Sequence, residues 1–118
     1  MATAYSVTEQ FVMWLASLGY TSSTYPAADA IPPFVTVERV GGGVIDTVDR
    51  PQMAIQAWAA TEAEAEALAT EIRNRVLLGS KPYGVLSAFI NAGPYPFWDE
   101  STRLPRYQLV LDCTAIIE

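Results

Sequence analysis

The chain of 118 residues contains no histidine and a single cysteine. The lack of histidine removes the commonest general base and the commonest metal ligand. With Cys113 alone, an internal disulfide and a cysteine-rich metal site are excluded. Because Cys113 falls in an alternating apolar stretch, we expect an inert core thiol, with a reactive thiol as the alternative. No catalytic residue, metal site or cofactor is therefore expected.

Basic residues and long apolar runs are also scarce. Seven Lys and Arg residues are scattered along the chain against thirteen Asp and Glu, which gives a net charge of −6. Without a basic stripe, tight binding to a nucleic-acid backbone is not expected. No apolar run approaches the roughly 20 residues that span a membrane, and the first residues lack the pattern of a signal peptide. We therefore expect a soluble protein made in the cytoplasm, with no membrane partner.

Apolar residues, in contrast, are plentiful. They make up 51% of the chain, while charged residues make up 17%. A chain of this length forms one domain around one core, so residues 1–118 are expected to be a single domain. The apolar fraction is high for a small monomer, which favours a surface that a partner covers.

Two helices are predicted from their first turns and their apolar spacing. Ser6 begins one capping-box pair and Thr61 the other, each with a glutamate three residues later. Apolar residues at helical spacing then predict helices over about 7–18 and 62–78. A glycine follows each of these segments, as is common at helix ends.

Four strands are predicted in the rest of the chain. The runs 34–40, 53–59, 85–90 and 106–117 are rich in β-branched, aromatic or alternating apolar residues. In the second run the alternation predicts one buried face. We therefore expect an α+β domain of order α-β-β-α-β-β. Its sheet would be four-stranded and mostly antiparallel, with two helices packed on one face.

The segment between the first two strands exceeds the usual hairpin length. Three consecutive glycines open it, without a dinucleotide fingerprint or a phosphate loop. Val44, Ile45 and Val48 are apolar residues in a connection that is otherwise expected to be polar. We expect a mobile loop over 41–50 that becomes ordered against a neighbouring molecule, with a loosely packed hairpin loop as the alternative.

The segment around Trp98 is the main candidate for chemistry. Asp99 and Glu100 are adjacent, so on an extended chain they point apart and do not form an acid–base pair. Burial by Trp98 would raise a carboxyl pKa, which leaves an enzyme or a small-molecule-binding domain on a ferredoxin-like sheet as an alternative. Stacking of single-stranded bases on the aromatic residues near Arg103 is a further alternative.

Several short segments of the sequence resemble segments of tail terminator proteins of long-tailed (siphovirus- or myovirus-type) bacteriophages. The resemblance follows the order of the predicted elements over nearly the whole chain and includes the amphipathic N-terminal helix. The segments that carry it are Pro33-Phe34-Val35-Thr36-Val37, Arg50-Pro51, the acidic helix start Thr61–Ala67, and Arg106-Tyr107-Gln108-Leu109.

The resemblance implies a structural role in the virion, with assembly in the cytoplasm of the host bacterium. Such proteins form a homo-hexameric ring that caps the tail tube, ends its polymerisation and provides the surface that joins the head. The implied partners are the major tail tube protein and head–tail connector proteins, with DNA only in passage. Another head–tail connector or neck protein is the alternative. The candidate subunit or tube interface comprises Val44, Ile45, Asp46, Val48, Asp49, Arg50, Trp98 and Arg103.

Overall fold

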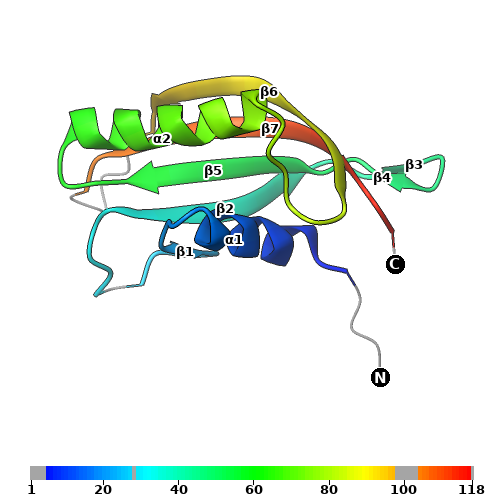
Figure 1. Cartoon of the computed structure of the whole chain (residues 1–118), viewed down its shortest axis with the longest axis horizontal. Helices are drawn as coiled ribbons and strands as arrows, with labels where there is room; N and C mark the ends of the chain where they lie inside the picture. The colour runs from blue at the N-terminus through cyan, green and yellow to red at the C-terminus, as the bar shows by residue number, and fades with distance from the viewer. Residues whose placement is uncertain (1–4, 28, 98–103, 118) are drawn as a thin grey trace.

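The computed structural model describes residues 5–27, 29–97 and 104–117. Within these residues the chain forms two helices and one mixed sheet of seven strands (Figure 1). In chain order the elements are α1 (Val7–Ser17), β1 (Ser22–Ser23), β2 (Phe34–Gly41), β3 (Val44–Ile45), β4 (Val48–Asp49), β5 (Gln52–Trp58), α2 (Glu62–Leu77), β6 (Val85–Pro96) and β7 (Arg106–Ala115).

The body of the sheet has the order β1-β2-β5-β7-β6. β7 pairs with β5 along one edge and with β6 along the other, while β4 pairs with β7 just beyond the end of β5. The pairing of β1 with β2 is parallel, and the other pairings are antiparallel. The prediction of a four-stranded sheet was therefore wrong, although the mixture of helices and strands agrees with it. The additional strands have two residues each, which is too short to leave a periodic signal in the sequence.

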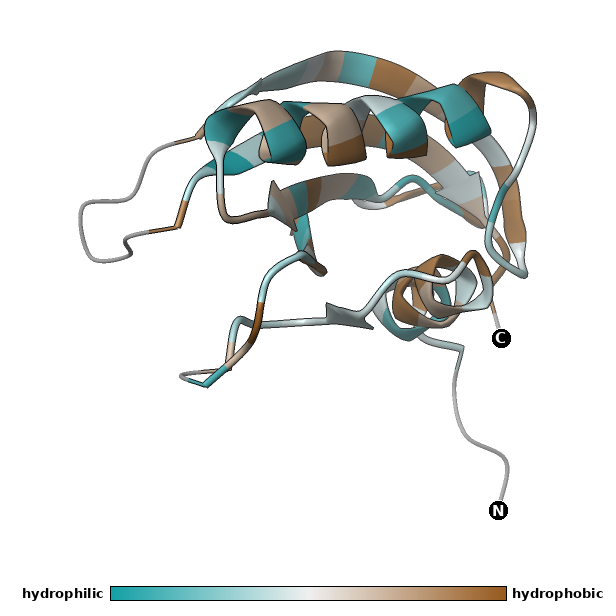
Figure 2. Ribbon diagram, turned by 60° about the vertical axis from the view of Figure 1, so that its left-hand side comes forward, coloured by the Kyte–Doolittle hydropathy of each residue, from teal (hydrophilic) through white to brown (hydrophobic). Residues whose placement is uncertain are grey.

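Both helices contribute to one apolar cluster on the same face of the sheet. Figure 1 shows α2 over β5, β6 and β7 and α1 beside β1 and β2. Phe11 and Leu15 from α1, and Ile72 from α2, are fully buried against alternate residues of the strands. The exposed side of α2 carries its hydrophilic residues, which alternate with hydrophobic ones along the ribbon in Figure 2.

The helix starts follow the sequence prediction. The Ser6 hydroxyl accepts a hydrogen bond from the Glu9 amide N–H at 3.2 Å, and the Thr61 hydroxyl accepts one from the Glu64 amide at the same distance. These bonds satisfy amide groups that have no partner in the first turn of a helix. The predicted helices 7–18 and 62–78 end within one residue of those observed.

β5 is buried on both faces, which corrects the prediction of one buried face. Met53, Ile55 and Ala57 face the helices, while Gln56 and Trp58 lie on the opposite face and are 8% and 1% exposed. β5 is a central strand, and its neighbours carry large side chains on both faces. The sequence reveals the alternation but not that side chains of the sheet itself cover the second face.

β6 is twice as long as predicted. It continues beyond residue 90, where the predicted strand ends, and it pairs with β7 as far as Pro96. Irregularities in the pairing near Leu86, Asn91 and Gly93 allow the strand to bend while it follows β7. The glycine and the two prolines of this segment mark irregular strand positions, not a turn.

Candidate functional site

A β-hairpin arm, residues 42–50, projects from the end of the sheet. Figure 1 shows β3 and β4 beyond the ends of β2 and β5. Asp46 and Thr47 form its tip, and both have positive φ angles, 52° and 62°. Two consecutive residues of this kind are typical of the two-residue type I′ turn that joins twisted strands. The predicted loop over 41–50 is thus a hairpin with the shortest common turn.

The base of the arm requires one particular glycine. Gly42 has φ of 90°, and a Cβ atom there would lie 1.9 Å from the carbonyl oxygen of Arg50. The Arg50 amide also donates a 3.1 Å hydrogen bond to the Gly43 carbonyl. Gly42 therefore lets the two strands of the arm approach each other closely at its base.

An ion pair holds the arm to the body of the sheet. The Arg39 guanidinium donates two hydrogen bonds of 2.8 Å, one to each carboxylate oxygen of Asp49. A third bond, of 3.2 Å, runs from Arg39 to the Gly41 carbonyl. Hydrogen bonding by Arg39 lowers the pKa of Asp49 below its usual 3.8. Such two-pronged pairs have a fixed geometry, so the ion pair orients the arm as well as stabilising it.

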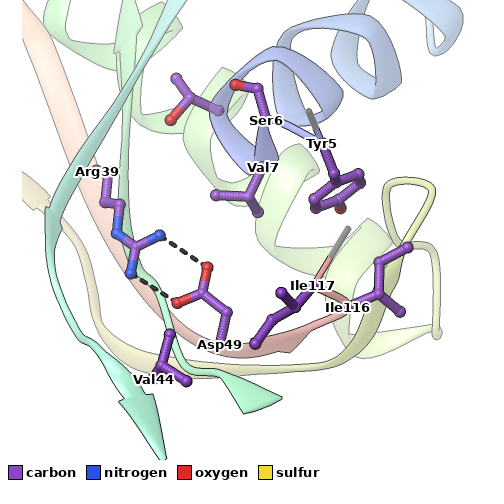
Figure 3. A pocket seen from close by; sticks show the side chains of 9 residues that line it. Tyr5, Ser6, Val7, Arg39, Val44, Asp49, Ile116 and Ile117 are labelled. Atoms are coloured by element: carbon purple, nitrogen blue, oxygen red, sulfur yellow. Dashed lines mark hydrogen bonds and ion pairs between the residues drawn. The ribbon is translucent and has the colours of Figure 1, made fainter. Parts of the chain in front are cut away.

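A groove lies between the arm, the start of α1 and the end of β7 (Figure 3). Its volume is about 430 Å³. Val44 of the arm, Val7 of α1 and the segment after β7 provide apolar walls, while the Arg39–Asp49 pair forms a polar side. The complete lining is Tyr5, Ser6, Val7, Thr8, Arg39, Val44, Asp49, Ile116 and Ile117. A groove with such walls suits an apolar side chain from another molecule.

The structure brings six of the predicted interface residues together on the arm. Val44 lies opposite Asp49, and Ile45 lies opposite Val48, while Asp46 and Arg50 stand at the tip and the base. The side chains of Val44 and Ile45 are 63% and 55% exposed. The other two predicted residues, Trp98 and Arg103, lie outside the described residues, as do Asp99 and Glu100.

The sequence prediction missed the residues that complete the groove. Tyr5 reaches it from the start of the chain, and Ile116 and Ile117 reach it from the end. Tyr5 is fixed by a hydrogen bond that its hydroxyl donates to the Tyr83 carbonyl, and Ile116 donates one to the Gly84 carbonyl. Residues so far apart in the sequence are not linked by any periodic pattern, so the groove could not be predicted from the sequence.

A second, smaller hollow of about 280 Å³ lies on the sheet face away from the helices. Arg50, Phe89 and Asp112 contribute to it. Asp112 accepts hydrogen bonds from Gln52 at 3.1 Å and Asn91 at 2.8 Å. Cys113 of the same strand turns its side chain toward the core under the helices, and burial, followed by the charge of Asp112, raises the pKa of its thiol to about 12. This thiol stays protonated near neutral pH and is a poor nucleophile.

Across residues 5–27, 29–97 and 104–117, no group of three or more Cys, Asp or Glu side chains is placed to hold a metal ion. Neither helix is long and apolar enough to cross a membrane in this part of the chain. No protein-family model matches the sequence, and comparison with curated proteins gives no significant match.

Proposed function

We propose that this chain is a structural subunit that assembles with copies of itself into a ring. The arm is the observation that carries the proposal. It places exposed apolar side chains, Val44 and Ile45, on a hairpin that projects from the body. Exposed apolar side chains gathered in this way are typical of surfaces that contact another protein.

Within this class, we propose the tail terminator of a long-tailed bacteriophage as the particular protein. The proposal rests on the resemblance of short sequence segments to tail terminator proteins, together with the arm, the groove and the net charge of −6. In a ring around a channel, acidic subunits repel the phosphate backbone, so that DNA passes without binding. The arm would contact a neighbouring copy or the end of the tail tube.

Another neck protein, such as a head–tail connector component, remains the second candidate. It shares the small size, the acidic charge and the need for a ring. The two differ in where the ring binds, because a terminator binds the end of the tail tube and a connector binds the head. Gene order separates the virion proposals from other functions, since a phage protein of this kind is encoded among other phage genes.

The experiment mixes the purified protein with tail tubes made from the tail tube protein of the same genome. Negative-stain electron microscopy is expected to show rings at tube ends, and tubes should stop elongating. Val44→Lys together with Ile45→Lys should abolish capping because it places charges on the contact surface. Ile31→Lys is the matched control, since Ile31 is 84% exposed and lies outside the arm. Uncapped tubes, or a genome without phage genes, would overturn the proposal.

A further inference from the structure

Tyr5, in the segment before α1, is held on the connection between α2 and β6. Its hydroxyl donates a hydrogen bond to the Tyr83 carbonyl oxygen, and the two aromatic rings meet edge to face with their centres 6.3 Å apart. A Cβ atom on Gly84 would lie 2.6 Å from Cε2 of Tyr5. The Tyr5 side chain therefore rests on the bare backbone of Gly84, where no larger residue leaves room for it.

A turn of the chain presents Gly84 to Tyr5. The Val85 amide donates a 3.2 Å hydrogen bond to the Pro82 carbonyl, which closes a β-turn with Gly84 as its third residue. Gly84 has φ of 79°, and a positive φ at this position is typical of a type II turn. The Ile116 amide donates a 2.9 Å hydrogen bond to the Gly84 carbonyl. Gly84 thus joins the segment before α1 to the segment after β7.

The two joined segments form one wall of the groove beside the arm. Tyr5 and Ile116 both line the groove, and Figure 3 shows them on the side away from Val44 and Asp49. On the arm side, the ion pair between Arg39 and Asp49 fixes the opposite wall. The contact between Tyr5 and Gly84 does the same for the wall formed by the two segments. The groove therefore has a definite shape on both sides.

We infer that Tyr5 is a positioning residue of the proposed contact surface and that Gly84 places it. This inference rests on the proposed function, in which the arm and its groove belong to the surface that caps the tail tube. A side chain at position 84 would meet Cε2, Cζ and the hydroxyl of Tyr5, which are the far end of a side chain that can rotate. Such a substitution displaces Tyr5 and alters the groove without disrupting the core.

Two glycines of the same connection provide a matched pair of variants. Gly79 has φ of 92°, and a Cβ atom there meets nothing within 4 Å. Gly79→Ala therefore strains the backbone without touching Tyr5, whereas Gly84→Ala strains the backbone and displaces Tyr5. The measured quantity is the protein concentration that caps half of the tail tubes. It should rise about tenfold in Gly84→Ala, as for the loss of one well-packed contact, and stay unchanged in Gly79→Ala.

Variants of Tyr5 complete the experiment. Tyr5→Ala removes the aromatic ring and should raise the same concentration about tenfold. Tyr5→Phe keeps the ring but loses the hydrogen bond to Tyr83, so the rise should be smaller. Gly84→Ala introduced into Tyr5→Ala should add nothing, because no ring remains to be displaced.

A structural measurement accompanies the capping assay. NMR contacts between the Tyr5 ring and the α protons of Gly84 report where the side chain lies. These contacts should be present in the original protein and in Gly79→Ala, and absent in Gly84→Ala. Urea unfolding checks that each variant is folded under the conditions of the assay.

The outcomes separate the inference from the function. Absence of the NMR contacts in the original protein would overturn the placement of Tyr5. Normal capping by Tyr5→Ala would show that Tyr5 is a structural contact only, which overturns the inference and leaves the proposed function standing. Equal losses in Gly79→Ala and Gly84→Ala would show that backbone strain causes the effect. If the original protein caps no tubes but shows the NMR contacts, the proposed function is overturned, and the role of Tyr5 in it falls as well.

Discussion

The amide of Gln56 donates a 2.7 Å hydrogen bond to the side-chain oxygen of Gln108, in the centre of the sheet face away from the helices. The bond is one link in a chain across four strands. Trp58 donates to Thr36 at 3.0 Å, Thr36 donates to Gln56 at 2.7 Å, and Gln108 donates to the Tyr95 hydroxyl. Among the described residues no buried side-chain polar atom lacks a partner. The chain of bonds therefore fixes the register of four strands.

Removing Gln56 should destabilise the protein more than removing a similar residue that is exposed. Gln56→Met leaves the Gln108 side-chain oxygen without its donor and the Thr36 hydroxyl proton without its acceptor, although Thr36 still accepts from Trp58, and the change should cost about 2–3 kcal/mol of unfolding free energy. Gln52→Met is the matched control on the same strand, where the bond to Asp112 is exposed, and should cost less than about 1 kcal/mol. Urea unfolding measures both. Equal losses would mean that the buried bonds do not stabilise the sheet.

The same face shows what the sequence can and cannot predict. The alternation of Met53, Ile55 and Ala57 correctly predicts which side of β5 meets the helices. It does not predict that Trp58 stacks on Phe34, with ring centres 5.4 Å apart, or that Arg106 lies 4.6 Å from the Trp58 ring centre. These contacts join β2, β5 and β7. Their residues are far apart in sequence, so no local pattern records them.

The arm illustrates a second limit. Helices were predicted to within a residue because Ser6 and Thr61 are local signals at their starts. The arm was predicted as a loop because Asp46 and Thr47 are not the Asn-Gly pair that usually marks a type I′ turn. The signal that was present is the pair of β-branched apolar residues Val44 and Ile45 before the turn and Val48 after it. The groove could not be predicted, since the two ends of the chain form one of its walls.

Two neighbouring glycines of the arm should respond differently to the same substitution. Gly42→Ala places a Cβ atom 1.9 Å from the Arg50 carbonyl oxygen, so the base of the arm must open. Gly43→Ala meets no atom within 4 Å and its φ is not in the left-handed region. We expect Gly42→Ala to lose more than about 1 kcal/mol and Gly43→Ala to be neutral or slightly stabilising. Thermal unfolding compares them, and similar melting temperatures would contradict the observed base.

Acid should release the arm before it unfolds the sheet. Because hydrogen bonding by Arg39 lowers the pKa of Asp49, the ion pair stabilises the folded arm above pH 3.8. This stabilisation is lost as the pH falls below 3.8 through the lower pKa of the folded state. The expected size is about 0.2–1 kcal/mol, as for other partly exposed pairs.

The amide signal of Arg50 in NMR spectra reports the release, since this amide bonds to Gly43 within the arm. Its acid-dependent shift should disappear in Asp49→Asn, which cannot ionise. Asp46→Asn at the tip is the control and should keep the shift, because Asp46 forms no ion pair with the residues that the structure describes. A shift that survives in Asp49→Asn would show that another group controls the arm.

Alkali should destabilise the whole domain through two buried acids. Burial raises the pKa of Cys113 from 9.0 to about 12, and a hydrogen bond with Glu66, together with burial, raises the pKa of Tyr107 from 10.0 to about 12. The unfolded chain loses these protons first as the pH rises. Their stabilising contribution is therefore complete below pH 9 and is lost between pH 9 and about pH 12.

Single variants separate the two contributions. In Cys113→Ala the decline of the unfolding free energy should begin near pH 10, where a tyrosine of the unfolded chain ionises. In Tyr107→Phe the decline should begin at the same pH as in the original protein but should be shallower. Urea unfolding at intervals of pH between 8 and 11 measures the slopes. Each variant is compared with its own stability at pH 8, which removes the pH-independent cost of altering the core. A stability that stays constant up to pH 11 in the original protein would contradict the burial of both groups.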